Sequence, residues 1–349
     1  MKHVPSVRIG DREIGSNHPC YLIAEVGTTA LGDLKMALDL VAAGADAGVD
    51  AVKFQVIDPA QLSDRSVTYE VRNGTQVEHV NMHEMFSRLK FSATQWREIA
   101  KACHQCGVQF FATTDYIAGV DLLESLDVPA HKLGAWDCTF RPLIERMGAT
   151  GKPMFVDLGP TTEGEIDDIV RWYRDAGGSA VLFLHDYHTE IPDEMNMSAI
   201  RHLTTIQPWP VGYSSPGRDS DLDFLSLGMG VAVVEKRLIM SHSLQAFHAH
   251  ESLEPDELKD WVKRIRIAER AIGSAAIQPS AVDRDGSLKH YRSICTLHPL
   301  RAGEPFSPDN LHGKRPGTGI PTARLEEFWG RKAARDIDAD TLITEADVL

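Results

Sequence analysis

Charged and polar residues stand at the ends of several short apolar segments of this 349-residue sequence. The residues at these ends are Glu25, Lys53, Gln55, Thr113, Lys132, Ser214 and Lys236. A lysine that ends a buried segment is rarely structural, because an unpaired ammonium group is costly to bury. Lysines gathered in one cleft could hold an anionic small molecule, and a carboxylate such as Glu25 could move a proton. The segment ends therefore outline a candidate active site.

The segments that carry these residues alternate with long amphipathic stretches. There are eight of them: Tyr21–Glu25, Ala51–Gln55, Gln109–Thr113, Ala130–Gly134, Pro153–Asp157, Ala180–His185, Pro210–Ser214 and Val231–Lys236. Buried parallel strands are continuous aliphatic and β-branched runs, because both of their faces are covered. Eight such strands alternating with helices predict a closed (β/α)8 TIM barrel in the α/β class. Chemistry in such barrels lies at the carboxyl ends of the strands, where the polar residues fall.

The rest of the sequence predicts a long loop, a linker and a second domain in addition to the barrel. The long stretch between Gln55 and Ser92 has little periodicity, so we expect either a functional loop that includes Tyr69 or a solvated loop. Residues 1–274 form the predicted barrel domain, and residues 275–289 form a polar linker. Residues 290–349 contain short strand-like pieces broken by glycine and proline, which predict a small β-rich domain.

Composition excludes several classes of partner. The formal net charge of −14 argues against a nucleic-acid ligand, which would favour a basic surface. No apolar run approaches the roughly 18 residues that a membrane span requires, and the first residues lack an apolar signal-peptide core. The five cysteines form no paired framework, so we expect a reducing, cytoplasmic location.

Eight motifs give the chain a family resemblance. They are Ile23–Gly27, Ala51–Gln55, Leu123–Lys132, Gly212–Ser214, Glu235–Lys236, Ser252–Leu258, Lys314–Ile320 and Gly330–Ile337. In this order they resemble the sialic acid synthase (N-acetylneuraminate synthase) family over nearly the whole length, and the tail resembles its antifreeze-like SAF domain. The resemblance implies a TIM-barrel enzyme that condenses phosphoenolpyruvate with an aldehyde sugar, typically N-acetylmannosamine. The products would be a 2-keto sugar acid and phosphate, and the assembly a domain-swapped homodimer.

The resemblance also implies a role for each candidate residue. Phosphoenolpyruvate carries a phosphate and a carboxylate, so its pocket needs cations and oriented donors. The positions that match substrate-binding residues are Thr113, Lys132, Ser214, Lys236, Gln55 for sugar hydroxyls, and Arg315 for the N-acetyl group on the neighbouring subunit. The candidate catalytic residues are Glu25, Lys53 and Asp137, which match family positions, and Arg237, which departs from the family pattern. Glu25 would orient the sugar or move a proton, and Asp137 would handle the water that adds to the substrate.

One part of the family pattern is missing. The family holds a divalent metal, usually manganese, through two histidines, and their positions carry Pro216 and Arg237 here. Proline offers no side-chain ligand, and a guanidinium has no lone pair to donate to a metal. The family's manganese site is therefore not retained, and we expect a non-standard site that is either metal-free or holds a metal at a displaced position.

Three explanations of this change remain open. Arg237 could take over the metal's task of polarising the aldehyde oxygen. Alternatively, His185, His188, His248 and His250 could build a displaced metal site, since imidazole is a common ligand for such ions. In the third explanation, the chain acts on another substrate or has lost catalysis and binds a sugar or an anion.

Overall fold

The structure is a computed structural model that describes residues 6–15, 18–73, 76–189 and 191–349, although the side chains of 70–73 and 76–78 are not described. The chain divides into two compact units, residues 1–273 and residues 274–349. Each unit has a hydrophobic core of its own. The two units are therefore considered separately.

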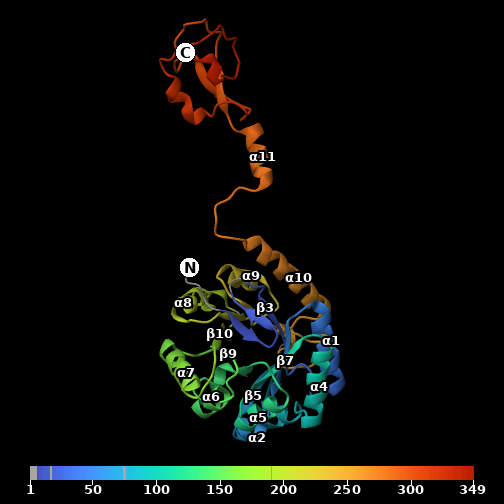
Figure 1. Cartoon of the computed structure of the whole chain (residues 1–349). Helices are drawn as coiled ribbons and strands as arrows, with labels where there is room; N and C mark the ends of the chain where they lie inside the picture. Colours follow the sequence, from blue (N-terminus) through green and yellow to red (C-terminus); the bar gives the residue numbers. More distant parts are fainter. Residues whose placement is uncertain (1–5, 16–17, 74–75, 190) are drawn as a thin grey trace. The chain divides into compact units, whose positions relative to one another are not determined.

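Eight parallel strands of the first unit close into a barrel (Figure 1). In barrel order they are β3 (Tyr21–Gly27), β4 (Ala51–Val56), β7 (Gln109–Thr114), β8 (His131–Leu133), β9 (Met154–Asp157), β10 (Val181–His185), β11 (Gly212–Ser214) and β12 (Val233–Arg237). The last strand pairs with the first, from Val233 beside Tyr21 to Arg237 beside Glu25. Each of the eight predicted apolar segments overlaps one of these strands, so the predicted TIM barrel is confirmed.

Helices surround this barrel. They are α1 (Leu34–Ala47), α4 (Ala93–Gln105), α5 (Ile117–Ser125), α6 (Arg141–Gly148), α7 (Glu163–Asp175), α8 (Ala199–Ile206), α9 (Asp221–Gly228) and α10 (Pro255–Ile272). Local sequence fixes their ends, as α1 illustrates. Asp33 caps its first turn by accepting a hydrogen bond from the Met36 amide, and Gly48 ends it with a φ of 87°. Between these caps, α1 buries Leu40 and Val41 against the barrel core.

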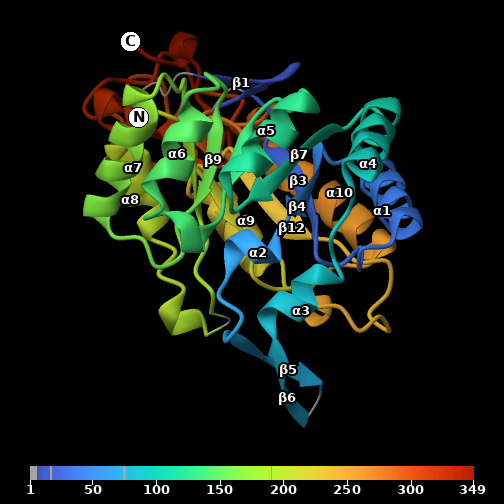
Figure 2. The same ribbon diagram turned by 90° about the horizontal axis from the view of Figure 1, so that it is seen from below.

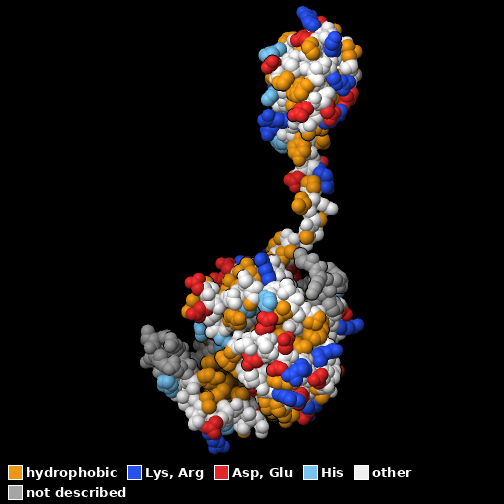
Figure 3. Space-filling view, turned by 90° about the vertical axis from the view of Figure 1, so that its left-hand side faces the viewer, with side chains coloured by type: hydrophobic (Ala, Val, Ile, Leu, Met, Phe, Trp, Pro, Cys, Tyr) orange, Lys and Arg blue, Asp and Glu red, His pale blue; other side chains and the backbone are white. Residues whose placement is uncertain are grey.

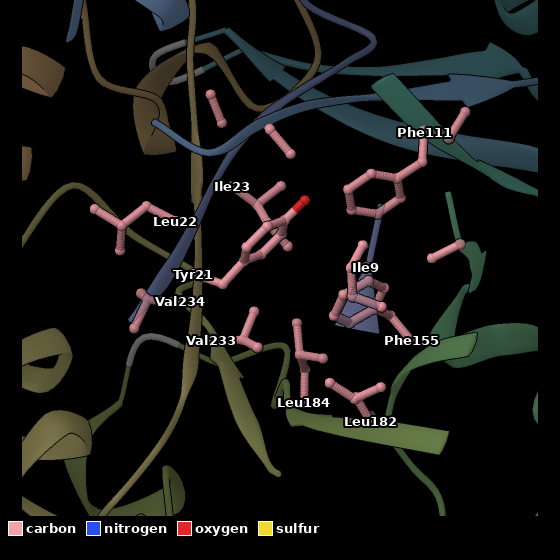
Figure 4. Packing of buried hydrophobic residues seen from close by; sticks show 14 of the residues in the cluster. Ile9, Tyr21, Leu22, Ile23, Phe111, Phe155, Leu182, Leu184, Val233 and Val234 are labelled. Carbon is pink, nitrogen blue, oxygen red and sulfur yellow. The ribbon is translucent and has the colours of Figure 1, made fainter. Parts of the chain in front are cut away.

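Side chains alternate between the inside and the outside of the barrel. In Figure 4, Tyr21 and Ile23 of β3 lie toward the aromatic ring of Phe155, whereas Leu22 lies on the opposite side of the strand. The rings of Tyr21 and Phe155 stack with their centroids 6.2 Å apart. Because the period of a strand is two residues, Glu25 continues the inward series of β3. The same rule directs Glu235 and Arg237 of β12 inward and Lys236 outward.

An N-terminal hairpin lies against the amino end of the barrel. Strands β1 (Val7–Ile9) and β2 (Arg12–Ile14) pair antiparallel, and the side chain of Ile9 is fully buried. Gln109 Nε2 donates a hydrogen bond to the Ile9 carbonyl oxygen at 2.7 Å, and Tyr21 Oη donates to Gln109 Oε1 at 2.5 Å. The barrel core is thereby covered at the end opposite to the polar strand ends.

The segment between β4 and α4 is more regular than its sequence suggests. It contains α2 (Pro59–Leu62), the antiparallel hairpin of β5 (Thr68–Asn73) and β6 (Gln76–Asn81), and α3 (Met82–Ser87). Figure 2 shows this hairpin projecting from the barrel. The ring of Tyr69 lies against those of Phe86 and Phe247, at centroid distances of 6.3 and 5.8 Å. These aromatic contacts fix the base of the hairpin beside the carboxyl ends of the strands.

The second unit is a small domain with many turns. Its antiparallel strands are β13 (Ser293–Thr296) and β14 (Leu311–Lys314), and its short 3₁₀ helices include η4 (Thr322–Phe328) and η5 (Glu345–Asp347). Ile294, Phe306 and Phe328 are buried in its core. The range predicted as a polar linker contains helix α11 (Ala281–His290), which buries none of its residues. A capping box formed by Ser280 and Asp283 satisfies the free amides at the start of this helix.

Charged side chains of both signs lie on the surface. On the face that Figure 3 shows, Lys and Arg side chains are interspersed with Asp and Glu side chains. Within the part of the chain that the structure describes, no helix is both long and apolar enough to cross a membrane.

We predict that Ile9→Ala lowers the free energy of unfolding by about 2–5 kcal/mol, because the substitution leaves a cavity beneath the barrel. Chemical denaturation with a fluorescence readout measures this change. The exposed neighbour Arg8 provides the control, and Arg8→Ala is expected to change stability by less than about 0.5 kcal/mol. Equal stability of the two variants would show that the hairpin does not support the barrel.

Candidate active site

Two buried lysines meet at one carboxylate near the carboxyl end of the barrel. Lys53 of β4 lies 3.3 Å from Glu235 Oε1 and also pairs with Glu25. Lys132 of β8 lies 2.9 Å from Glu235 Oε2 and 2.7 Å from Asp157 of β9. Glu235 therefore bridges two ammonium groups that come from strands far apart in the sequence. Sequence reasoning did not single out Glu235 as a site residue.

Neighbouring charges in this cluster shift the pKa values of Lys53 and Glu235. Burial alone would lower the pKa of Lys53, but the carboxylates of Glu235 and Glu25 raise it above its usual value. Burial opposes ionisation of Glu235 as well, yet the charges of Lys132 and Lys53 hold its pKa below the usual range. Both lysines and Glu235 are therefore charged near neutral pH. This arrangement presents a fixed pair of cations at the strand ends.

Two further carboxylates are poised to take up a proton. Burial raises the pKa of Glu25 to about 7, although the charge of Lys53 acts in the opposite direction. Burial also raises the pKa of Asp157 to about 7, against the charge of Lys132. Carboxyl groups with pKa values near neutrality can act as general acids or bases.

A cavity of about 320 Å³ opens above this cluster. The sequence-predicted residues that line it are Glu25, Lys53, Gln55, Thr113, Ser214, Arg237, His188 and His248. Lys132 lies below this lining and is fully buried. Tyr69, from the stretch predicted as a functional or solvated loop, also lines it. Sequence reasoning did not assign a role to several other residues that line it: Phe86, Trp136, Asp157, Asp186, Glu235 and Phe247. Residues from most strands of the barrel thus converge on one pocket.

A second ionic cluster forms one wall of the cavity. Arg237 Nη1 lies 2.6 Å from Glu251 Oε2, and His248 Nδ1 lies 2.8 Å from the same oxygen. Burial would raise the pKa of Glu251, but the hydrogen bond with His248 and the charge of Arg237 lower it. The guanidinium also reaches the carbonyl oxygen of Pro216, at 3.5 Å. Pro216 and Arg237, at the positions of the family's metal-binding histidines, are therefore in contact with each other. Their side chains offer a positive charge and no lone pair for a metal.

Two acidic residues, Asp115 and Asp137, form a pair beside the lining residue Gln55 but outside the cavity lining. Gln55 Nε2 donates to Asp115 Oδ2 at 3.3 Å, and Asp115 in turn shares a hydrogen bond with Asp137. Burial and the neighbouring charge of Asp115 raise the pKa of Asp137 to about 7. Asp137 does not itself line the cavity. Asp115 follows the strand end at Thr113 by two residues, so the inward periodicity of β7 could have revealed it.

Several predicted residues lie elsewhere. Lys236 points out of the barrel, where its amine contacts Ser215 at 2.8 Å and Asp223 at 2.9 Å. This placement does not fit the predicted contact with substrate, because the amine is buried outside the cavity and is already bonded to Ser215 and Asp223. Arg315 belongs to the second unit, in which its Nε donates to the His290 carbonyl oxygen at 2.8 Å.

The histidines considered as metal ligands do not form one cluster. His185 is fully buried and contacts the Met195 carbonyl oxygen at 2.8 Å, whereas the side chain of His250 is 75% exposed. In the described ranges, no three histidine, cysteine, aspartate or glutamate side chains are arranged to hold a metal ion. The residues present therefore do not fit the manganese site that the resemblance implies.

Comparison with known proteins follows the same division into two units. Residues 40–276 match the model of the NeuB family, and residues 291–349 match that of the SAF domain. The chain belongs to the NeuB family. Enzymes of the sialic acid synthase type make up this family, and its members serve carbohydrate biosynthesis.

Individual relatives extend over almost the whole chain. Uncharacterized protein MJ1065 of Methanocaldococcus jannaschii is 31% identical over 346 residues, which is 98% of each chain. The N,N'-diacetyllegionaminic acid synthase of Legionella pneumophila is 29% identical and covers 96% of each chain. The N-acetylneuraminic acid synthetase structure from Leptospira borgpetersenii has a TM-score of 0.71 at 23% identity, covers 82% of this chain and 96% of its own, and supports the fold.

The buried ion pair of Lys236 with Asp223 leads to a prediction about stability. Lys236→Met leaves the buried carboxylate of Asp223 without its cation, so we expect a loss of about 3–5 kcal/mol in the free energy of unfolding. Replacing both partners, in Lys236→Met with Asp223→Leu, is expected to recover most of this loss. Chemical denaturation compares the two variants. An unchanged stability of Lys236→Met would show that the pair is not structural.

Proposed function

We propose that this chain condenses phosphoenolpyruvate with an aldehyde sugar similar to N-acetylmannosamine. The products are a sialic-acid-type 2-keto sugar acid and phosphate, and the site works without a bound metal. The observation that carries the proposal is the pair of buried lysines, Lys53 and Lys132, that meet at Glu235. The names of relatives such as the legionaminic acid synthase support the same reaction class.

Phosphoenolpyruvate fits the charge pattern at the floor of the cavity. Lys53 and Lys132 supply two positive charges, and the hydroxyl groups of Thr113 and Ser214 supply further donors. Thr113 already accepts a hydrogen bond from Lys53 Nζ at 3.2 Å. In the free protein the lysines are paired with three carboxylates, so the substrate anion must replace part of these ion pairs. Protonation of Glu25 would release Lys53 for this exchange.

The reaction balances with one water molecule. The C3 carbon of phosphoenolpyruvate forms a bond with the aldehyde carbon, and the aldehyde oxygen takes up a proton. Water adds at C2, and the bond between C2 and the phosphate oxygen breaks to release phosphate. Glu25 lines the cavity and donates the proton to the aldehyde oxygen. Asp137, which lies behind the lining and has a raised pKa, accepts the proton of the attacking water through one further water molecule, and the leaving phosphate takes up the proton of the new C2 hydroxyl group.

Arg237 takes the role of a Lewis acid in this scheme. Its guanidinium carries fixed donors that can polarise the aldehyde oxygen as negative charge develops there. The ion pair with Glu251 at 2.6 Å holds the guanidinium in the cavity wall. Gln55 lies in the same lining and is suited to bond the sugar hydroxyl groups.

We also propose the assembly and location that the resemblance implies. A domain-swapped homodimer would bring Arg315 of a second copy to the sugar. The cysteines are all free, which suits the reducing environment of the cytoplasm.

Phosphate release tests the proposed activity, together with mass spectrometry of the keto acid formed from a panel of aldehyde sugars. We expect turnover with at least one sugar, no effect of a chelator, and loss of turnover in Lys53→Met. Chelator-sensitive turnover would contradict the role given to Arg237. Tight sugar or anion binding without turnover of any sugar would favour a binding protein on the same scaffold.

We predict that phosphoenolpyruvate binds more weakly as the pH rises through about 7. Below this pH, Glu25 and Asp157 hold protons and leave the lysines to the substrate, whereas above it both carboxylates ionise and compete for them. The dissociation constant, measured by calorimetry from pH 6 to 9, should rise by up to tenfold per pH unit for each proton taken up. Glu25→Gln should flatten this dependence. A pH-independent affinity in the unmodified protein would contradict the exchange of ion pairs.

A further inference from the structure

An aromatic side chain that the proposed reaction does not use lies open at the cavity. Trp136 belongs to the 3₁₀ helix η1 (Ala135–Asp137), which directly follows β8, and it lines the cavity. It remains 70% exposed, which is unusual for so large an apolar side chain. Exposed apolar surface inside a ligand cavity indicates contact with a ligand.

A second ring holds the indole in place. The rings of Trp136 and His188 stack with their centroids 4.8 Å apart and their planes inclined by 22°. His188 lies three residues beyond the end of β10, and its Nε2 is 3.5 Å from Asp186 Oδ2. A Cβ atom at Gly159 would stand 2.5 Å from the Cβ of Ala135, so only glycine lets these loops approach. Three loops at the carboxyl end of the barrel therefore cooperate to build the stacked pair.

The surroundings of the stacked pair define the chemistry that it can recognise. Asp186, whose Oδ2 lies 3.5 Å from Nε2 of the stacked His188, lines the same cavity, so a phosphate group beside the rings would meet its negative charge. The aromatic rings of Tyr69 and Phe247 also line this cavity. A flat apolar ring surface suits the apolar side of an uncharged sugar and its methyl-bearing substituents.

We propose that Trp136, stacked on His188, is the specificity-determining residue for the acceptor. Its open surface packs against the apolar side of an uncharged aldehyde sugar, and the carboxylate of Asp186 beside the rings disfavours a sugar phosphate. This inference rests on the proposed condensation and narrows its substrate class. Phosphoenolpyruvate binds at the lysines and does not contact the indole.

Steady-state kinetics of Trp136→Ala and Trp136→Phe test the inference. We expect the alanine variant to raise the acceptor KM by about tenfold or more, with the KM for phosphoenolpyruvate unchanged within about twofold. Phenylalanine keeps a flat ring and should recover most of the loss. Phe140→Ala, on the same loop but outside the cavity lining, is the matched control and should leave both KM values unchanged. An unchanged acceptor KM in Trp136→Ala, or faster turnover of N-acetylmannosamine 6-phosphate than of N-acetylmannosamine, would overturn the proposal.

A binding measurement separates this inference from the proposed reaction. Acceptor sugars added without phosphoenolpyruvate should change the intrinsic fluorescence of the unmodified protein. The change should disappear in Trp136→Phe and persist in Trp172→Phe, whose ring lies under Arg141 and Arg171 outside the cavity. Absence of turnover together with this pattern would reject the condensation but retain the sugar contact. A fluorescence change that survives in Trp136→Phe would reject the contact itself.

Discussion

The bridge that Glu235 makes between Lys53 and Lys132 is the interaction on which the rest of the site depends. Two ammonium groups in a barrel interior would repel each other and lose their hydration. One ionised carboxylate within 3.3 Å of the first and 2.9 Å of the second makes their burial tolerable. The barrel is needed for this contact, because β4, β8 and β12 meet only when the sheet closes. The cation pair is therefore a property of the fold and not of any local motif.

In the proposed reaction, the same cluster links substrate binding to protonation, and activation of the acceptor takes place at another wall of the cavity. The carboxylates of Glu25 and Asp157 balance the lysines before substrate arrives, and their raised pKa values let them give up this role near neutral pH. Arg237 is fixed by Glu251 on a different wall. In the proposed reaction, anion binding and activation of the aldehyde thus use separate cations. This division suits a member of the NeuB family whose two metal positions carry Pro216 and Arg237.

The sequence predicted the barrel because its eight strands are continuous apolar runs that end in polar residues. Strict use of the two-residue period would also have found Glu235 and excluded Lys236 and His185, because neighbouring residues of a strand face opposite sides. No periodicity could have found the contacts made by loops. The stacking of Trp136 on His188 joins residues of two loops that only the complete barrel brings together.

A crystal structure with phosphoenolpyruvate bound tests the central claim most directly. The account predicts that an anionic oxygen of the substrate lies within about 3 Å of Lys53 Nζ and takes the place of Glu25, while Glu235 still joins Lys53 to Lys132. Substrate bound outside this cavity, with Lys53 still paired to Glu25, would contradict the account.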